Sequence, residues 1–205
     1  MKIGVIGSGK IGANAARLFA GAGHDVAVSN SRGPETLASL AQEIGGRAAN
    51  VEEAAAFGEV VLVAMPFFAH EALPAKPLSG KVVVDAMNYY AARDGEMDLG
   101  GRSSSEALAE HLPDSRVVKA FNTMYYETLS AEGRPSAPDE ERLVLFVAGD
   151  DDDAKTVVSQ LIEEIGFSAV DAGSLGESRR QEPGSPIYNV PMDPQLAREA
   201  LAGMR

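Results

Sequence analysis

The sequence predicts an α/β fold with a doubly wound, mostly parallel β-sheet and a small α/β extension at its C-terminal end. Through the first half of the 205-residue chain, short runs rich in Val and Ile alternate with amphipathic helical segments. Strand–helix–strand alternation of this kind indicates βαβ units. The apolar runs mostly lack polar residues at alternate positions, which is typical of parallel strands that helices cover on both faces.

The first half of the chain is expected to hold most of the parallel sheet. Its predicted strands are Lys2–Ile6, Asp25–Ser29, Arg47–Ala49, residues 60–64 and residues 81–85. Its predicted helices are residues 11–22, residues 34–44 and Val51–Phe57. Asn50 precedes the last of these helices and Glu53 lies within its first turn. This arrangement is similar to a capping box and supports a helix start at this point.

The second half of the chain mixes long polar connections with further strands and helices. We expect a loop at residues 91–105, a polar connection at residues 131–141 and an irregular tail at residues 181–188. The predicted strands are residues 116–121, 143–148 and 168–171, and the predicted helices are residues 105–111, 151–165 and 194–204. The aspartates at residues 150–153 lie where one of these helices begins, and carboxylates there interact favourably with the helix dipole. We therefore interpret this run as a solvated helix start and not as a metal or acid/base site.

Composition excludes several classes of site. The chain has no cysteine, which excludes disulfides, thiolate metal sites, iron–sulfur clusters and cysteine nucleophiles. It has 3 histidines, none at ligand spacing from another, so no metal site is expected. No apolar run reaches the ~20 residues of a membrane span, and the N-terminal run is too short for a signal peptide, so we expect no membrane partner and a cytoplasmic location. The net charge of −12 also disfavours nucleic acid as a partner.

A glycine-rich motif directly follows the first predicted strand and opens an Ala-rich helix. In this context the pattern GxGxxG predicts a Rossmann-type dinucleotide-binding site. Gly7 would allow the tight turn, Gly9 would let the backbone approach a diphosphate, and Gly12 would let the helix pack on the strand. The free N–H groups of the helix start would then bind the diphosphate. A glycine-rich turn without a ligand is the alternative. The residues concerned are Gly7, Ser8, Gly9, Lys10, Ile11 and Gly12.

The end of the second predicted strand indicates which dinucleotide binds. An NAD site usually has Asp or Glu here, about 20 residues after the glycines, to accept the ribose 2′-hydroxyl. This chain instead has Asn30, Ser31 and Arg32, and no acid at the strand end. Asn30 and Ser31 can donate hydrogen bonds, and the planar guanidinium of Arg32 suits a phosphate. The cofactor prediction is therefore NADP(H), the alternative being a turn with a solvated arginine. Thr36 in the following segment is included in the predicted cofactor-binding set.

Polar and aromatic residues also follow the later strands of the predicted sheet. Because carboxyl ends of parallel strands converge at one edge, we expect these residues to border the cofactor or a second molecule, the hydride acceptor. For each single residue, a role in the core or in a turn is an equally good interpretation. The predicted cofactor residues here are Ala64, Met65, Pro66 and Asn88, and the predicted acceptor residues are Phe121, Asn122 and Thr123.

Taken together, residues 7–12, 30–36, 65–66 and 118–123 resemble the coenzyme F420-dependent NADP oxidoreductase family, F420 being a deazaflavin. A similar domain forms the cytosolic part of some membrane ferric reductases. The resemblance implies hydride transfer between NADPH and a flavin-like ring, usually in a homodimer. It also implies that Ser31 and Arg32 bind the 2′-phosphate. Family members with deazaflavin activity often carry a second basic residue where Thr36 stands, which leaves F420, FMN, FAD, a quinone or another small conjugated electrophile open as the acceptor.

Hydride transfer between stacked rings needs positioning and electrostatics and no nucleophile, so we predict no catalytic side chain. We expect one domain over residues 1–205, with residues 1–90 binding the dinucleotide and about 115–205 serving the acceptor and dimerisation. The nicotinamide would lie over Met65 and Pro66, and the acceptor would enter between Asn88, residues 121–123 and the tail at 183–188. Two alternatives stay open, namely an NADP(H)-binding redox sensor without turnover and a small keto or imine reductase. The latter class appends a long helical domain, which the strands predicted beyond residue 90 disfavour.

Overall fold

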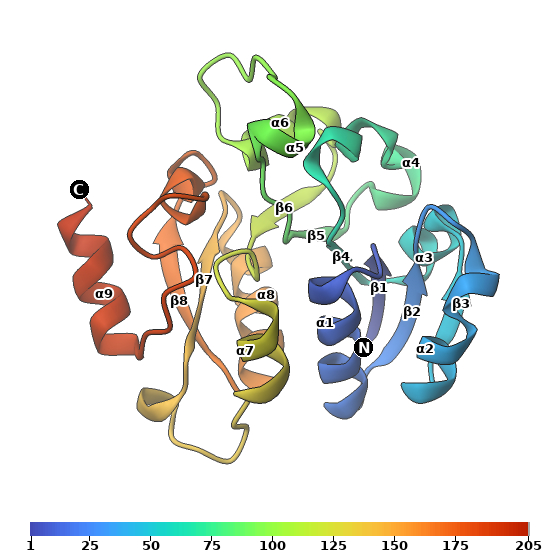
Figure 1. Cartoon of the computed structure of the whole chain (residues 1–205), viewed down its shortest axis with the longest axis horizontal. Coiled ribbons are helices and arrows are strands. Elements are labelled where there is room, and N and C mark those ends of the chain that lie inside the picture. Colours follow the sequence, from blue (N-terminus) through green and yellow to red (C-terminus); the bar gives the residue numbers. More distant parts are fainter. Residues whose placement is uncertain (205) are drawn as a thin grey trace.

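The computed structural model describes residues 1–204, which form an eight-stranded sheet with helices on both faces (Figure 1). The strand order is β3-β2-β1-β4-β5-β6-β7-β8. The strands are β1 (Lys2–Ile6), β2 (Asp25–Ser29), β3 (Arg47–Ala49), β4 (Val60–Val63), β5 (Val82–Asp85), β6 (Arg116–Lys119), β7 (Val144–Ala148) and β8 (Ser168–Gly173).

Most strands are connected by helices that cross over the sheet. The α-helices are α1 (Lys10–Gly21), α2 (Ala38–Glu43), α3 (Val51–Phe57), α4 (Ala75–Leu78), α5 (Ala91–Asp94), α6 (Ser104–His111), α7 (Tyr126–Ala131), α8 (Asp152–Glu164) and α9 (Pro194–Gly203). Short 3-10 helices are η1 (Pro34–Leu37), η2 (Phe67–Ala72), η3 (Asp139–Glu141) and η4 (Gly176–Gln181). None of the helices formed by residues 1–204 is long and apolar enough to cross a membrane.

The direction of the strands confirms the predicted fold class. Strands β1 to β6 pair in parallel, and their order is that of a doubly wound dinucleotide-binding sheet. β7 runs antiparallel to β6 and pairs with it through Lys119 and Ala148. β8 is parallel to β7, and α8 lies between them in the chain, so β7, α8 and β8 form the C-terminal extension. Strand order reverses between β1 and β4, and ligands of such sheets bind at that point, outside the carboxyl ends of the strands.

Two apolar clusters cover the two faces of the sheet. On one face, α1, α7 and α8 pack around Phe19, Phe121 and Phe167. On the other face, α3, α4 and α6 pack around Phe67 and Leu108. A third cluster joins α9 to β7 and β8 at the C-terminal edge (Figure 1). The strands inside the sheet, such as β4, β5 and β7, are buried on both sides, which explains why their sequences are almost continuously apolar, whereas the edge strands β3 and β8 are partly exposed.

The local elements differ from the predictions mainly where helices are short. The predicted helix at residues 34–44 is a 3-10 turn, η1, followed by the shorter α2. The predicted loop at residues 91–105 contains α5 and the start of α6. Ser103 caps α6 in a capping box with Glu106, a signal that the sequence carries and that we did not predict. The predicted capping box of Asn50 and Glu53 is present at α3.

The aspartate run at residues 150–153 begins a helix, as predicted. Asp151 is the N-cap residue of α8, and its side chain accepts a hydrogen bond from the Ala154 N–H at 2.9 Å. The same carboxylate accepts two hydrogen bonds from Arg116 at 2.5 and 2.6 Å. These contacts hold the pKa of Asp151 well below its ordinary value, mainly through the Arg116 hydrogen bonds. Asp151 therefore anchors α8 to the start of β6.

A buried ion pair joins the carboxyl ends of β5 and β6. Asp85 and Lys119 are neighbours in register, both fully buried, and the Asp85 Oδ2–Lys119 Nζ distance is 3.1 Å. Lys119 also donates to the Met87 carbonyl at 2.6 Å. Asp85 accepts hydrogen bonds from the Ser105 hydroxyl at 2.7 Å and from the Met87 N–H at 2.9 Å. The pair thereby fixes the backbone that follows β5 and the first turn of α6.

Replacing Asp85 with Asn should strongly destabilise the protein, because it leaves the Lys119 ammonium buried without its anionic partner. We expect the free energy of unfolding to fall by about 3–5 kcal/mol. Urea denaturation followed by circular dichroism measures this change. Glu43→Gln, in the exposed pair with Arg17, is the matched control and should cause no measurable change. Equal effects of the two substitutions would contradict the role given to Asp85.

Candidate functional site

The glycine-rich turn after β1 is shaped by two glycines that the fold itself requires. Gly7 has a φ of +105°, and a Cβ there would lie 2.2 Å from the Ala64 carbonyl oxygen. A Cβ on Gly12 would lie 1.9 Å from the Gly7 carbonyl oxygen. The turn and the first turn of α1 therefore pack too closely for any other residue at either position, as the motif predicts.

Gly9 is different, because the described residues give no packing or backbone reason for a glycine there. Its φ of −69° suits any residue, and a Cβ would meet no described atom within 4 Å. Gly9 is the N-cap of α1, whose first turn has no side-chain cap and no acidic residue. Free N–H groups at a helix start bind phosphate groups well. The open space above Gly9 therefore fits a diphosphate.

A cavity of about 480 Å³ extends from this turn toward Arg32, and we call it the arginine cavity. Asn30 shapes its polar end by donating hydrogen bonds to Ser8 Oγ and Thr36 Oγ1, both at 3.0 Å. The Arg32 N–H donates to Asn30 Oδ1 at 2.9 Å, which orients the exposed loop. In the part of the chain that the structure describes, the Arg32 side chain forms no ion pair, so its guanidinium is free to bind an anion. The lining residues are Ile6, Gly7, Ser8, Gly9, Asn30, Ser31, Arg32, Val51, Ala64, Met65, Pro66, Phe68, Ala69, Ala72 and Leu73.

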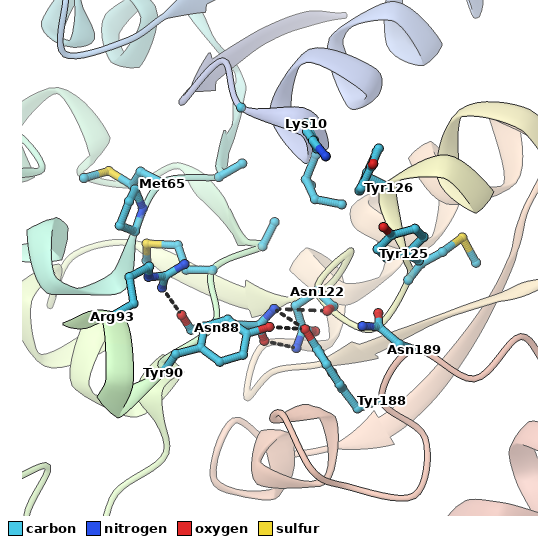
Figure 2. Close-up of a pocket in the computed structure, with 17 residues that line it drawn as sticks. Lys10, Met65, Asn88, Tyr90, Arg93, Asn122, Tyr125, Tyr126, Tyr188 and Asn189 are labelled. Carbon is cyan, nitrogen blue, oxygen red and sulfur yellow. Dashed lines mark hydrogen bonds between the residues drawn. The ribbon is translucent and has the colours of Figure 1, made fainter. Parts of the chain in front are cut away.

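A second cavity of about 360 Å³ lies on the other side of the same turn, and we call it the tyrosine cavity (Figure 2). Gly9, Ala64, Met65 and Pro66 line both cavities, so the two cavities adjoin at the ends of β1 and β4, and we call them together the groove. The remaining lining residues are Lys10, Ile11, Ala86, Met87, Asn88, Tyr90, Arg93, Asn122, Met124, Tyr125, Tyr126, Tyr188 and Asn189.

Asparagine side chains tie together the floor of the tyrosine cavity. Asn122 Nδ2 donates to Asn88 Oδ1 at 3.0 Å and to the Gln181 carbonyl at 2.6 Å. Asn88 Nδ2 donates back to the Asn122 carbonyl at 3.2 Å. The loops after β5 and β6 are therefore joined by side-chain amides (Figure 2), and Asn122 also connects them to the end of η4.

Most residues predicted for the site line this groove. Gly12 does not line it, because this residue packs against the Gly7 turn. Thr36 does not line it either, but its hydroxyl accepts a hydrogen bond from Asn30, which does. Of the three predicted acceptor residues, Asn122 lines the tyrosine cavity and the other two do not. Phe121, with a φ of +67°, points into the core and packs edge-on against Phe19 at 5.8 Å. Thr123 is buried beside a much smaller cavity. Neighbouring residues in this turn point in different directions, which strand-end position alone does not specify.

The tyrosines of this cavity were not predicted as individual site residues, although the predicted acceptor entrance includes the tail at residues 183–188, where Tyr188 lies. Of the 5 tyrosines of the chain, Tyr90, Tyr125, Tyr126 and Tyr188 line it. Tyr90 is the N-cap of α5, and Tyr125 and Tyr126 begin α7, two helices that we did not predict. Lys10 Nζ lies 3.8 Å from the centre of the Tyr126 ring, a cation–π contact that joins the glycine turn to α7.

The tyrosine cavity has an aromatic, amide-rich lining with cations at its edge. Among the described residues no carboxylate lines it, although Arg93 pairs nearby with Asp94 at 2.7 and 2.8 Å. Arg93 also donates to the Asn88 carbonyl at 2.6 Å, and its hydrogen bonds with Asp94 raise the pKa of the guanidinium. Burial raises the pKa of the Tyr188 hydroxyl above its ordinary value, so this group stays protonated at neutral pH. Such a lining suits a flat, conjugated ligand.

His70, in the η2 helix that follows Pro66, has a structural role. It is buried and stacks on Phe67 with ring centres 4.4 Å apart. Its Nδ1 lies 2.9 Å from the Phe67 carbonyl oxygen. These contacts account for the histidine within η2.

Comparison with known proteins finds that the chain is similar to several oxidoreductases. Residues 2–89 match the model of the family described as NADP oxidoreductase coenzyme F420-dependent. The chain is 34% identical to metalloreductase STEAP3 of Rattus norvegicus over 183 residues, which cover 88% of this chain and 36% of that protein. It is 29% identical to the F420-dependent NADP reductase of Methanocaldococcus jannaschii over 145 residues, which cover 66% of this chain and 63% of that protein.

A solved structure matches almost the whole chain. A hypothetical protein from Sinorhizobium meliloti superposes with a TM-score of 0.82 and is 34% identical, with 94% of this chain and 95% of that chain covered. The C-terminal extension with β7 and β8 is thus part of an arrangement that a second protein shares. The curated relatives are longer, and this chain spans 36% of STEAP3 and 63% of the M. jannaschii reductase.

Gly9→Ala should separate ligand binding from stability. A Cβ at this position meets no described atom, so we expect the free energy of unfolding to change by less than about 1 kcal/mol. The same Cβ would occupy space next to the helix start, so the dissociation constant of NADPH should rise at least about tenfold. Urea denaturation and fluorescence titration with NADPH measure the two effects. Gly12→Ala is the contrasting variant, because its Cβ clashes with the turn and should destabilise the fold. Unchanged NADPH binding in Gly9→Ala would contradict the diphosphate site.

Proposed function

Because this chain belongs to the coenzyme F420-dependent NADP oxidoreductase family, we propose that it transfers a hydride between NADP(H) and a flat, flavin-like acceptor. The observation that carries the proposal is the groove made by the two adjoining cavities. It runs from Arg32, past Gly9, to a tyrosine-lined cavity, and Met65 and Pro66 border both parts. A dinucleotide in the groove would place one end at Arg32 and the other at the mouth of the tyrosine cavity.

The chain's own residues have distinct roles in this proposal. The first turn of α1 and the open space at Gly9 hold the diphosphate. Ser31 and Arg32 hold the 2′-phosphate, because no carboxylate among the described residues lines the arginine cavity to repel it. Met65 and Pro66 border the nicotinamide ring. When bound, NADPH supplies the hydride, and the protein contributes position and electrostatics.

The tyrosine cavity supports an acceptor with a flat ring. Tyr90, Tyr125, Tyr126 and Tyr188 offer aromatic faces and edges, and such rings pack well against conjugated ligands. The cavity adjoins the proposed nicotinamide position, which favours turnover over a sensor that binds NADP(H) alone. We propose coenzyme F420, FMN, FAD or a small quinone as the acceptor class. A homodimer remains a prediction from the family resemblance, and a cytoplasmic location remains a prediction from the sequence.

The proposed function is tested by binding and turnover on the purified protein. NADPH and NADH are titrated by fluorescence, and then FMN, FAD, F420 or menadione is added while the nicotinamide absorbance band is followed. We expect tighter binding of NADPH than of NADH, and rapid NADPH oxidation with at least one ring. Tight NADPH binding without turnover on any of these compounds would contradict a flavin-like acceptor.

Arg32→Ala should change the choice of cofactor. The variant loses charge-assisted hydrogen bonds to the 2′-phosphate, so we expect the KM for NADPH to rise about tenfold or more, while the KM for NADH stays the same. Steady-state kinetics with both cofactors measure the ratio. Arg134→Ala, an exposed arginine paired with Glu132 outside the groove, is the control and should change neither KM. An equal loss for NADPH and NADH in Arg32→Ala would contradict 2′-phosphate recognition.

A further inference from the structure

Two tyrosine hydroxyls meet on the wall of the tyrosine cavity, although they are 98 residues apart in the chain. Tyr90 comes from the start of α5, and Tyr188 comes from the tail that follows η4. Their hydroxyl groups are hydrogen-bonded to each other, and both residues line the cavity. Figure 2 shows the two hydroxyls pointing toward one another beside Asn88, with Lys10 of the glycine turn on the other side of the cavity.

The hydrogen bonds of this pair leave one phenolic hydrogen unused. Each tyrosine hydroxyl has one hydrogen to donate and can accept hydrogen bonds on its oxygen. One of the two hydrogens lies between the oxygens of Tyr90 and Tyr188. Asn88 Nδ2 is also a donor to the Tyr188 oxygen, at 3.4 Å, so it takes up no hydrogen from the pair. The Asn189 side chain is a further partner of Tyr188, and it lowers the pKa of the hydroxyl, which is the effect of a donor and not of an acceptor. Within residues 1–204 the second phenolic hydrogen therefore has no acceptor, and it is available to a molecule in the cavity.

The surroundings favour Tyr188 as the residue that carries the free hydrogen. When Tyr90 and Asn88 both donate to the Tyr188 oxygen, the Tyr188 hydrogen is left to point into the cavity. Tyr188 is half-buried, whereas Tyr90 is exposed and can exchange protons with water. Arg93 lies 5.0 Å from the centre of the Tyr90 ring, and its positive charge favours the anionic form of Tyr188. Burial keeps the pKa of Tyr188 above its ordinary value, so the hydroxyl is a donor and not a base.

We propose that Tyr188 donates a hydrogen bond, and then its proton, to the acceptor atom that gains negative charge during reduction. The inference rests on the proposed function and narrows its substrate class to conjugated rings with a carbonyl oxygen or ring nitrogen that is protonated on reduction, such as quinones. A dihydronicotinamide, the reductant, supplies both electrons as hydride. The acceptor heteroatom forms a bond to the Tyr188 proton, and the electrons of that O–H bond stay on the phenolate oxygen. Tyr90 passes its proton to Tyr188 and takes one from water, so one proton is consumed per acceptor reduced.

The test compares the wild type with Tyr188→Phe, a substitution that keeps the ring and removes the hydroxyl. The probe is menadione, whose carbonyl oxygens must be protonated. For Tyr188→Phe we expect kcat to fall about 100-fold, as for loss of a general acid. The wild type should show a normal solvent deuterium isotope effect on kcat, and the variant should lose it. Independently of turnover, the dissociation constant of menadione in the presence of NADP⁺ should rise about fivefold, since one neutral hydrogen bond is lost.

Tyr89→Phe is the matched control, because the Tyr89 hydroxyl donates to the Gly95 carbonyl at 2.9 Å and lies outside the tyrosine cavity. It should keep the kcat, the isotope effect and the menadione affinity of the wild type. The proposal is overturned when Tyr188→Phe retains the isotope effect and the menadione affinity of the wild type. This holds also when Tyr90→Phe loses both properties while Tyr188→Phe keeps them. If the wild type binds NADPH but reduces neither menadione nor FMN, the proposed function fails first, and this inference fails with it.

Discussion

The buried ion pair between Asp85 and Lys119 connects the sheet to the site. Removing two charges from water is costly, and only good geometry and further hydrogen bonds offset that cost. Here the pair also binds both backbone polar groups of Met87 and the hydroxyl of Ser105. The chain after β5 is therefore held directly in front of the strand ends. Asn88 follows Met87, so the position of the cavity floor depends on charges buried beneath it.

Both halves of the chain contribute residues to the groove. The glycine turn, Arg32 and the end of β4 belong to the N-terminal half, which the family model matches. The tyrosine cavity also needs α7 and the tail after η4, which lie in the C-terminal half. The tail after η4, which follows the C-terminal extension, supplies Tyr188 and Asn189 to the second cavity. A dinucleotide-binding half alone would lack these walls.

An acidic protein can still bind an anionic cofactor because the relevant charges act locally. The chain carries a net charge of −12, yet no described carboxylate lines either cavity. At ordinary salt, screening limits the reach of surface charges to about 8–10 Å. The N–H groups at the start of α1 and the guanidinium of Arg32 would contact the ligand directly. The neutral aromatic lining near Tyr188 lowers the local dielectric constant, so each hydrogen bond to a flat acceptor is stronger there than in water.

The sequence by itself determined the doubly wound sheet and the glycine turn, and from the residues after β2 it predicts a preference for NADP(H). Apolar runs, Gly7 and Gly12 act through local backbone geometry, so their pattern is readable without a structure. The tertiary structure decided which strand-end residues face the groove. Phe121 lies in the core while its neighbour Asn122 lines the cavity, because a turn with a positive φ points them apart. The tertiary structure also brings Tyr188 next to Tyr90. The two residues lie in a short helix and an irregular tail, and such segments are too short to leave a periodic signal in the sequence.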